Sequence, residues 1–147
     1  MSDQNNLSLL SSVKEFVEKC PFFADIDLHI DQTENTPVNY SIQTSGLTKL
    51  TENVFGDQQW QYNAILQSRE YTADDISRLN ATNFTERLIF WVEEQNKLSK
   101  LPELGGNRSA VSISADNGLL LALDDDGDRG IYQVQLHLIF DIYEEDF

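Results

Sequence analysis

The segment from Tyr132 to Ile142 constrains the fold of this chain more than any other segment. Apolar side chains alternate there with mostly polar ones, with Ile139 as the exception; the apolar positions are Tyr132, Val134, Leu136, Leu138, Phe140 and Ile142. A period of two is typical of a β-strand with one buried face and one wet face. The chain therefore needs a sheet whose apolar face is covered by a second layer.

Shorter segments also have the composition and alternation of strands. The predicted extended segments are Ile26–Ile30, Val38–Ser45, Trp60–Ser68, Ala110–Ser114 and Leu119–Leu123. Thr33–Pro37 is predicted to be a turn. Asn117-Gly118 favours a tight hairpin turn between the last two of these segments, because both residues tolerate a positive φ.

The N-terminal segment has the periodicity of a helix. Its apolar residues recur every three or four positions, at Leu9, Leu10, Val13, Phe16, Val17 and Cys20. We expect this helix to begin with Asn5 or Asn6 as its cap and to end before Pro21. Cys20 is the single cysteine and falls on the apolar stripe, so a packed thiol is expected and no disulfide can form within the chain.

Two further helical pieces are expected in the middle of the chain. Thr72 and Asp75 resemble a capping box and predict a short helical turn. Asn83 and Glu86 form a second start signal, which predicts a separate and longer helix. Its expected buried stripe is Phe84, Leu88, Trp91, Val92 and Gln95.

The order of these elements is helix, strands, helices and strands. It predicts an α+β fold in which helices pack on one face of a largely antiparallel or mixed β-sheet. The length of 147 residues suits one core, and no repeat or low-complexity linker divides the chain. We therefore expect a single domain that spans residues 1–147.

The chain is strongly acidic. It carries 25 acidic and ten basic residues, which gives a formal net charge of −15. Nucleic-acid binding depends on clustered Lys and Arg, whereas the basic residues here are scattered, so tight binding to nucleic acid or to an anionic membrane is not expected. The N-terminus lacks the features of a secretory signal, and no apolar stretch reaches bilayer length, so we expect synthesis in the cytoplasm.

The acidic residues are densest at Asp124, Asp125, Asp126 and Asp128. An EF-hand loop needs a Gly at its sixth position and a bidentate acid at its twelfth. A loop that begins at Asp124 has Arg129 and Gln135 at these positions, between strands and not helices. A solvated hairpin loop is therefore the favoured interpretation over a calcium site.

The residues that usually carry chemistry are sparse. His29 and His137 are the only histidines, and neither has a cysteine nearby in sequence to complete a zinc site. The chain contains no Gly-x-Ser-x-Gly, no His-Glu-x-x-His and no phosphate-binding glycine loop. We therefore expect no catalytic residue, no metal and no cofactor, and a protein that is not an enzyme.

Arg69, Glu70 and Tyr71 follow Ser68 at the end of a predicted strand. One interpretation is a salt bridge with a packed ring at the corner between strand and helix. The other is an oligomer or partner interface, because Arg and Tyr are favoured anchors there. The sequence leaves both interpretations open.

Several short motifs occur in a recognisable order. They are Cys-Pro-Phe after the first helix, Pro37–Ile42, Ser68-Arg69-Glu70-Tyr71, Trp91 with Glu93-Glu94-Gln95-Asn96, Leu101-Pro102 with Leu104, and Tyr132-Gln133-Val134-Gln135. This set resembles a family of small proteins of phages and prophages of Gram-positive bacteria, usually labelled minor capsid protein. The resemblance covers nearly the whole chain and extends to tail-terminator proteins of long-tailed phages.

The resemblance implies a structural role in a virion. Tail terminators form a ring, typically a hexamer, at the head-proximal end of the tail tube, where the ring stops tube growth and meets the head connector. The implied partners are thus other copies of the chain, the tail tube protein and head connector proteins. The implied fold is an α+β sandwich. The acidic loop at Asp124–Arg129 is denser in charge than the family leads us to expect.

Acidity suits a ring through which DNA passes, because an acidic wall does not retain phosphate. Asp124, Asp125, Asp126 and Asp128 are hence candidates for an acidic loop in the bore. Two alternatives in function are another head–tail joining or minor capsid protein, and an acidic binding module that acts on a host protein. An enzyme of unknown type is the least favoured.

Overall fold

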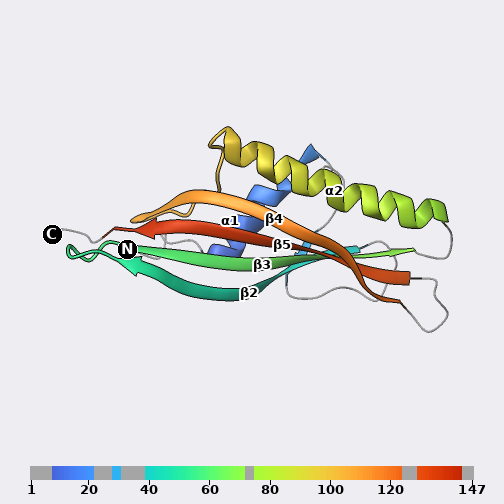
Figure 1. The fold of residues 1–147 in the computed structure, drawn as a ribbon, viewed down its shortest axis with the longest axis horizontal. Coiled ribbons are helices and arrows are strands. Elements are labelled where there is room, and N and C mark those ends of the chain that lie inside the picture. Colours follow the sequence, from blue (N-terminus) through green and yellow to red (C-terminus); the bar gives the residue numbers. More distant parts are fainter. Residues whose placement is uncertain (1–7, 22–27, 31–38, 72–74, 124–128, 144–147) are drawn as a thin grey trace.

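The computed structural model describes residues 8–21, 28–30, 39–71, 75–123 and 129–143. In this part of the chain the elements are α1 (Leu9–Glu18), β1 (Leu28–Ile30), β2 (Asn39–Glu52), β3 (Gln58–Tyr71), α2 (Asp75–Lys97), β4 (Arg108–Leu123) and β5 (Arg129–Ile142). Figure 1 shows the strands running along the longest axis of the molecule, with α2 beside them.

The described strands form one mixed sheet in the order β1-β2-β3-β5-β4. β1 is parallel to β2, whereas the β2–β3, β3–β5 and β4–β5 pairs are antiparallel. β5 therefore lies between two strands that precede it in sequence. The expected α+β fold with helices packed on a mixed sheet is confirmed.

The core lies between the sheet and the two helices. The alternating residues of β5 face it as predicted: Tyr132, Val134, Leu136, Leu138 and Phe140 are all buried. Val13, Phe16 and Val17 of α1 and Leu88 and Val92 of α2 belong to the same buried cluster, so both helices cover one face of the sheet. Burying each such side chain stabilises the fold by about 1.5–3 kcal/mol. The Phe16 and Trp91 rings join the helices, with centroids 5.1 Å apart.

α1 begins later than the sequence predicts. Its N-cap is Ser8, whose hydroxyl oxygen accepts a hydrogen bond of 3.0 Å from the backbone N–H of Ser11. The prediction of a cap at Asn5 or Asn6 is wrong, because the Ser8 hydroxyl satisfies one of the orphan donors of the first turn, at the point where the apolar stripe begins. Cys20 is buried, as predicted.

α2 is one continuous helix from Asp75 to Lys97, and the prediction of two separate helical pieces is wrong. Asn83 resembles a cap, but no Pro or Gly interrupts the helix on either side of it. Without such a breaker, packing on the sheet outweighs the weak preference of Asn for a helix end. Leu88 and Val92 are buried as expected, and Trp91 and Gln95 are half-buried.

β4 is also continuous, although Asn117-Gly118 predicted a turn. The register moves from Asp116↔Gln135 to Leu119↔Gln133, so β4 uses one residue more than β5 between these two pairs. The Asn-Gly pair thus falls in a β-bulge, where the extra residue bends the strand without ending it. The predicted turn at Thr33–Pro37 lies outside the described residues.

Candidate interaction surface

β2 and β3 extend past the ends predicted for them and form a long hairpin. Their last pair is Glu52↔Gln58, and residues 53–57 make the turn. Every residue from Leu47 to Phe55 is exposed. This part of the hairpin carries no helix on it, and Figure 1 shows it as the projecting end of the molecule.

The turn of the hairpin is held by one side chain. The Oδ1 atom of Asn53 accepts hydrogen bonds from the backbone N–H of Phe55, at 2.9 Å, and of Asp57, at 3.1 Å. The Asn53 N–H donates to the carbonyl of Asp57 over 2.9 Å. Gly56 has a φ of 92°, which glycine adopts without the strain of a side chain. These bonds hold the backbone of the turn in a closed, hydrogen-bonded conformation.

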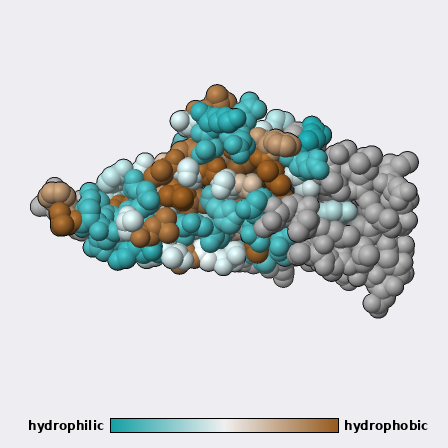
Figure 2. All heavy atoms as spheres, in the orientation of Figure 1, coloured by the Kyte–Doolittle hydropathy of each residue, from teal (hydrophilic) through white to brown (hydrophobic). Residues whose placement is uncertain are grey.

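This ordered turn presents apolar side chains to solvent. Val54 is 94% exposed and Phe55 is 78% exposed. We call the apolar residues at this end of the sheet the hairpin patch; its members are Leu47, Leu50, Val54, Phe55 and Tyr143. Figure 2 shows apolar atoms at the narrow end of the molecule, among polar ones. Single exposed apolar residues are ordinary, but a group of them typically marks an interaction site.

Tyr143 joins the patch because β5 ends beside the start of β3. Ile142 pairs with Gln58, and the backbone N–H of Tyr143 donates to the carbonyl of Asn107 over 2.9 Å. Carboxylates lie close by. Asp141 accepts a hydrogen bond of 3.1 Å from Gln59, and Glu52 lies 2.7 Å from the ammonium of Lys49.

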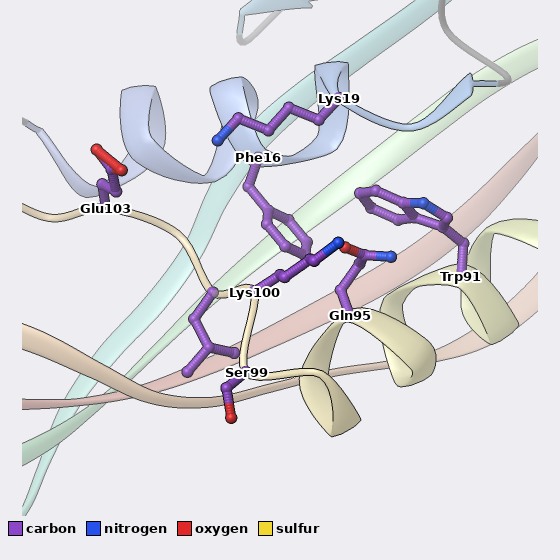
Figure 3. A pocket seen from close by; sticks show the side chains of 8 residues that line it. Phe16, Lys19, Trp91, Gln95, Ser99, Lys100 and Glu103 are labelled. Atoms are coloured by element: carbon purple, nitrogen blue, oxygen red, sulfur yellow. The ribbon is translucent and has the colours of Figure 1, made fainter.

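A second feature lies where the two helices meet. A cavity of about 340 Å³ opens there, which we call the helix-end pocket; it is lined by Phe16, Lys19, Trp91, Gln95, Ser99, Lys100, Leu101 and Glu103. Figure 3 shows that Phe16 and Lys19 come from α1, that Trp91 and Gln95 come from α2, and that Ser99, Lys100 and Glu103 come from the segment after α2.

The end of α2 shapes this pocket. The backbone N–H of Lys100 donates to the carbonyl of Gln95 over 2.9 Å, and that of Ser99 donates to the carbonyl of Asn96 over 3.1 Å. Ser99 has a φ of 60°. These bonds form a Schellman motif, which ends the helix and turns Lys100 toward the pocket.

The end of α2 and the segment after it are both fixed to β4. The Oδ1 atom of Asn96 accepts a hydrogen bond of 2.9 Å from the backbone N–H of Ile113. A guanidinium nitrogen of Arg108 donates to the carbonyl of Leu104, which is itself buried. Burial lowers the pKa of the Arg108 guanidinium from its usual value. These hydrogen bonds therefore hold the segment beside the pocket against the sheet.

The sheet face away from the helices carries a polar network. The Oδ1 atom of Asn63 lies 2.7 Å from Nδ1 of His137 and accepts a hydrogen bond of 2.9 Å from Gln61. The other ring nitrogen of His137 lies 3.2 Å from a carboxylate oxygen of Asp116. His137 thus links three strands. The residues that the structure describes contain no group of three or more His, Cys, Asp or Glu placed to hold a metal ion.

The residues predicted as an interface lie at the other end of β3. Arg69 pairs with Asn39 and Ile131, and Tyr71 pairs with Arg129. β3 continues to Tyr71, three residues past the predicted end at Ser68, but the side chains of Arg69, Glu70 and Tyr71 lie outside the described part of the structure. Both interpretations of these three residues, a corner salt bridge and an interface, therefore stay open.

The four aspartates predicted to form an acidic bore loop, Asp124, Asp125, Asp126 and Asp128, lie outside the described residues. The strands that flank them are described, and Leu123 and Glu70 both pair with Gly130. The backbone register thus brings the end of β3 next to the strand ends that flank the acidic segment. The end of β3 and the flanking residues Leu123 and Arg129 thus lie at one end of the sheet, and the hairpin patch lies at the opposite end.

Neither the hairpin patch nor the helix-end pocket is predicted from the sequence. One local signal for the patch existed, because Val54 and Phe55 are apolar residues between the turn formers Asn53 and Gly56. Apolar residues in a turn lack a core to enter and are left exposed. No comparable signal marks the pocket, whose lining comes from segments about 70 residues apart in sequence.

No family model matches the chain, and no curated protein matches it in sequence. One solved structure that carries no functional name covers 93% of this chain and 92% of its own, at 12% identity and a TM-score of 0.42. Within the described residues, none of the helices has the length and apolar character required to cross a membrane.

Proposed function

We propose that this protein is a tail terminator of a long-tailed bacteriophage. In this role copies of the chain close into a ring, with six the expected number, at the head-proximal end of the tail tube. The ring stops growth of the tube and offers a docking face to the head connector. The observation that supports this proposal best is the hairpin patch on an otherwise acidic molecule.

A ring needs each subunit to present two different surfaces to its neighbours. The net charge of −15 makes neighbouring copies repel one another, so apolar contacts must bring them together. Val54 and Phe55 offer such a contact on a turn whose backbone is held by hydrogen bonds to Asn53. Salt screens the repulsion, so self-association is expected to strengthen as ionic strength rises.

The acidic segment at Asp124, Asp125, Asp126 and Asp128 belongs to this proposal as the wall of the bore. Acidic side chains there would let DNA pass without being held. A structure of the assembled ring tests the assignment. Finding these residues on the outer rim would refute the bore but leave the ring intact.

Electron microscopy of phage particles made without this protein tests the function. A terminator predicts overlong tails that carry no head. Tails of normal length that fail to attach to heads would contradict termination and support the alternative of a head–tail joining protein. Complementation with the double substitution Val54→Ser and Phe55→Ser is expected to give the same overlong tails, whereas complementation with Phe90→Ser on α2 restores normal ones.

Affinity capture separates the structural role from an acidic module directed at a host protein. The immobilised chain is offered purified tail tubes and, separately, an extract of the host. Retention of tail tubes supports the proposal. A stoichiometric host protein in the absence of tube binding would replace it with the binding module.

A further inference from the structure

We infer that the hairpin patch of one copy inserts its Phe55 side chain into the helix-end pocket of a second copy. The inference rests on the proposed self-association and names the surfaces that carry it out. Each copy would then offer a projecting turn to one neighbour and a pocket to the other. A projection that fits a pocket elsewhere on the same chain makes a head-to-tail contact, the type that closes rings.

The turn cannot enter the pocket of its own chain. β3 leaves the turn at Gln58 and is paired from its first residue with Ile142 of β5. The hairpin is therefore an extension of the sheet and projects at the end of the molecule, whereas the pocket lies at the helices (Figure 1). A contact between these two features has to join different copies.

The turn is prepared for insertion. Binding costs free energy when a loop must be ordered, and that cost is small where the loop already has its bound conformation. The two hydrogen bonds accepted by Asn53 hold the backbone of Phe55 and Asp57 before any partner arrives. Phe55 already stands outside the sheet, with 78% of its surface exposed. Inserting its ring therefore removes apolar surface from water at little conformational cost.

The pocket suits an aromatic ring. Phe16 and Trp91 line it and already contact each other, with ring centroids 5.1 Å apart and planes at 46°. Leu101 adds an aliphatic wall. A further ring can meet these two in the tilted or offset arrangements that aromatic groups prefer. The volume of about 340 Å³ lies at the lower end of the range of ligand pockets, which suits a single side chain.

The charges of the two features are complementary. Lys19 and Lys100 line the pocket against a single acid, Glu103, in a chain where acids outnumber bases by more than two to one. The turn carries Asp57, which is half-buried, whereas Glu52 just before the turn is already paired with Lys49 at 2.7 Å, so Asp57 is the acidic group that the turn offers. Opposite charges around an apolar centre guide association and fix the orientation of the partners. The pocket is thus a cationic site suited to an acidic apolar turn.

Photocrosslinking tests the contact directly. The photoreactive residue p-benzoylphenylalanine replaces Phe55 in one isotopically labelled copy, which is mixed with unlabelled protein at raised salt and irradiated. Mass spectrometry is expected to find crosslinks between copies, on the peptides that contain Trp91 and residues 99–103. The same residue placed at Phe90, which is also exposed, is the matched control and should give no crosslinks to these peptides of another copy.

Sedimentation of two variants measures the contribution of each side. Phe55→Ser and Lys100→Glu are each expected to weaken self-association by roughly 10- to 30-fold, as for the loss of an interface anchor. Phe90→Ser should leave it unchanged. All three positions are exposed, so the variants are expected to fold. Circular dichroism checks this expectation.

The outcomes separate this inference from the proposed function. Oligomers that survive Phe55→Ser, or crosslinks that map away from the pocket, would overturn the insertion and leave the ring standing. Crosslinks in the pocket together with tails of normal length in particles lacking the protein would support the insertion and refute termination. Wild-type protein that gives neither oligomers nor crosslinks, with or without tail tubes, would overturn the insertion.

Discussion

Replacement of Leu88 by Ala tests how α2 lies on the sheet. Leu88 has no exposed surface and belongs to the core cluster, and α2 packs mainly across β4. The change removes buried methyl groups and leaves a cavity, because neighbours in a close-packed core relax only in part. Leu and Ala differ little in helix propensity, so the effect reports packing and not helix formation.

The expected loss in the free energy of unfolding is about 3 kcal/mol, within the range measured for buried Leu-to-Ala changes. For a chain of this size the melting temperature should fall by about 6–12 °C. Phe90→Ala is the matched control, two residues further along the same helix and 71% exposed. It removes more atoms, yet the free energy of unfolding should change by no more than about 0.5 kcal/mol.

Urea unfolding followed by far-ultraviolet circular dichroism measures both variants. The comparison is made at low protein concentration, so that self-association does not add to stability. The reasoning fails if Phe90→Ala costs as much as Leu88→Ala, since α2 would then present a different face to the sheet. A loss of less than about 1 kcal/mol in the free energy of unfolding for Leu88→Ala would also refute this packing of α2, because replacing a fully buried Leu in a packed core destabilises the fold by more than that.

Three further substitutions probe the backbone around the two features. Ser99→Gly should raise the free energy of unfolding by about 0.5–1 kcal/mol, because Ser99 adopts a left-handed φ of 60° that glycine adopts without strain. Thermal melts measure the gain, and a lower melting temperature for the variant would contradict this prediction. Asn53→Ala should cost about 1 kcal/mol or less and speed hydrogen exchange at the amides of Phe55 and Asp57, which would then lose their acceptor. Unchanged exchange there would show that another group holds the turn. Gly46→Ala should raise the free energy of unfolding by about 0.4–1 kcal/mol, because the added Cβ meets its nearest atom, on Asn63, at an ordinary contact distance of 3.7 Å. Chemical unfolding measures the change, and a lower free energy of unfolding would show that the added Cβ strains the strand.

Much of the fold follows from local pattern. The period-two alternation of β5 marks its buried face, and all five described residues on that face from Tyr132 to Phe140 are buried. The stripe of α1 likewise identifies Val13, Phe16 and Val17 as core residues. Such patterns can be read from sequence because each secondary structure repeats its own faces at a fixed period.

Local pattern failed where long-range pairing was stronger. Asn117-Gly118 is a good hairpin turn by itself, yet β5 is long enough to pair on both sides of it and the pair becomes a bulge. The start signal at Asn83 is similarly outweighed by the helix that continues through it. A local preference for a helix cap or a turn contributes about 1 kcal/mol to stability, and the packing of several side chains easily exceeds that contribution.

The sequence by itself determined the acidity of the molecule, its sheet-based fold class and the buried faces of its clearest strand and helix, because each is a property of composition or of neighbours in the chain. Only the tertiary structure decided which apolar residues remain outside. Leu47 and Phe55 are exposed because the hairpin extends beyond the helices that cover the rest of the sheet. The helix-end pocket exists only where α1 meets the end of α2, since no single segment of the chain contains both of its walls.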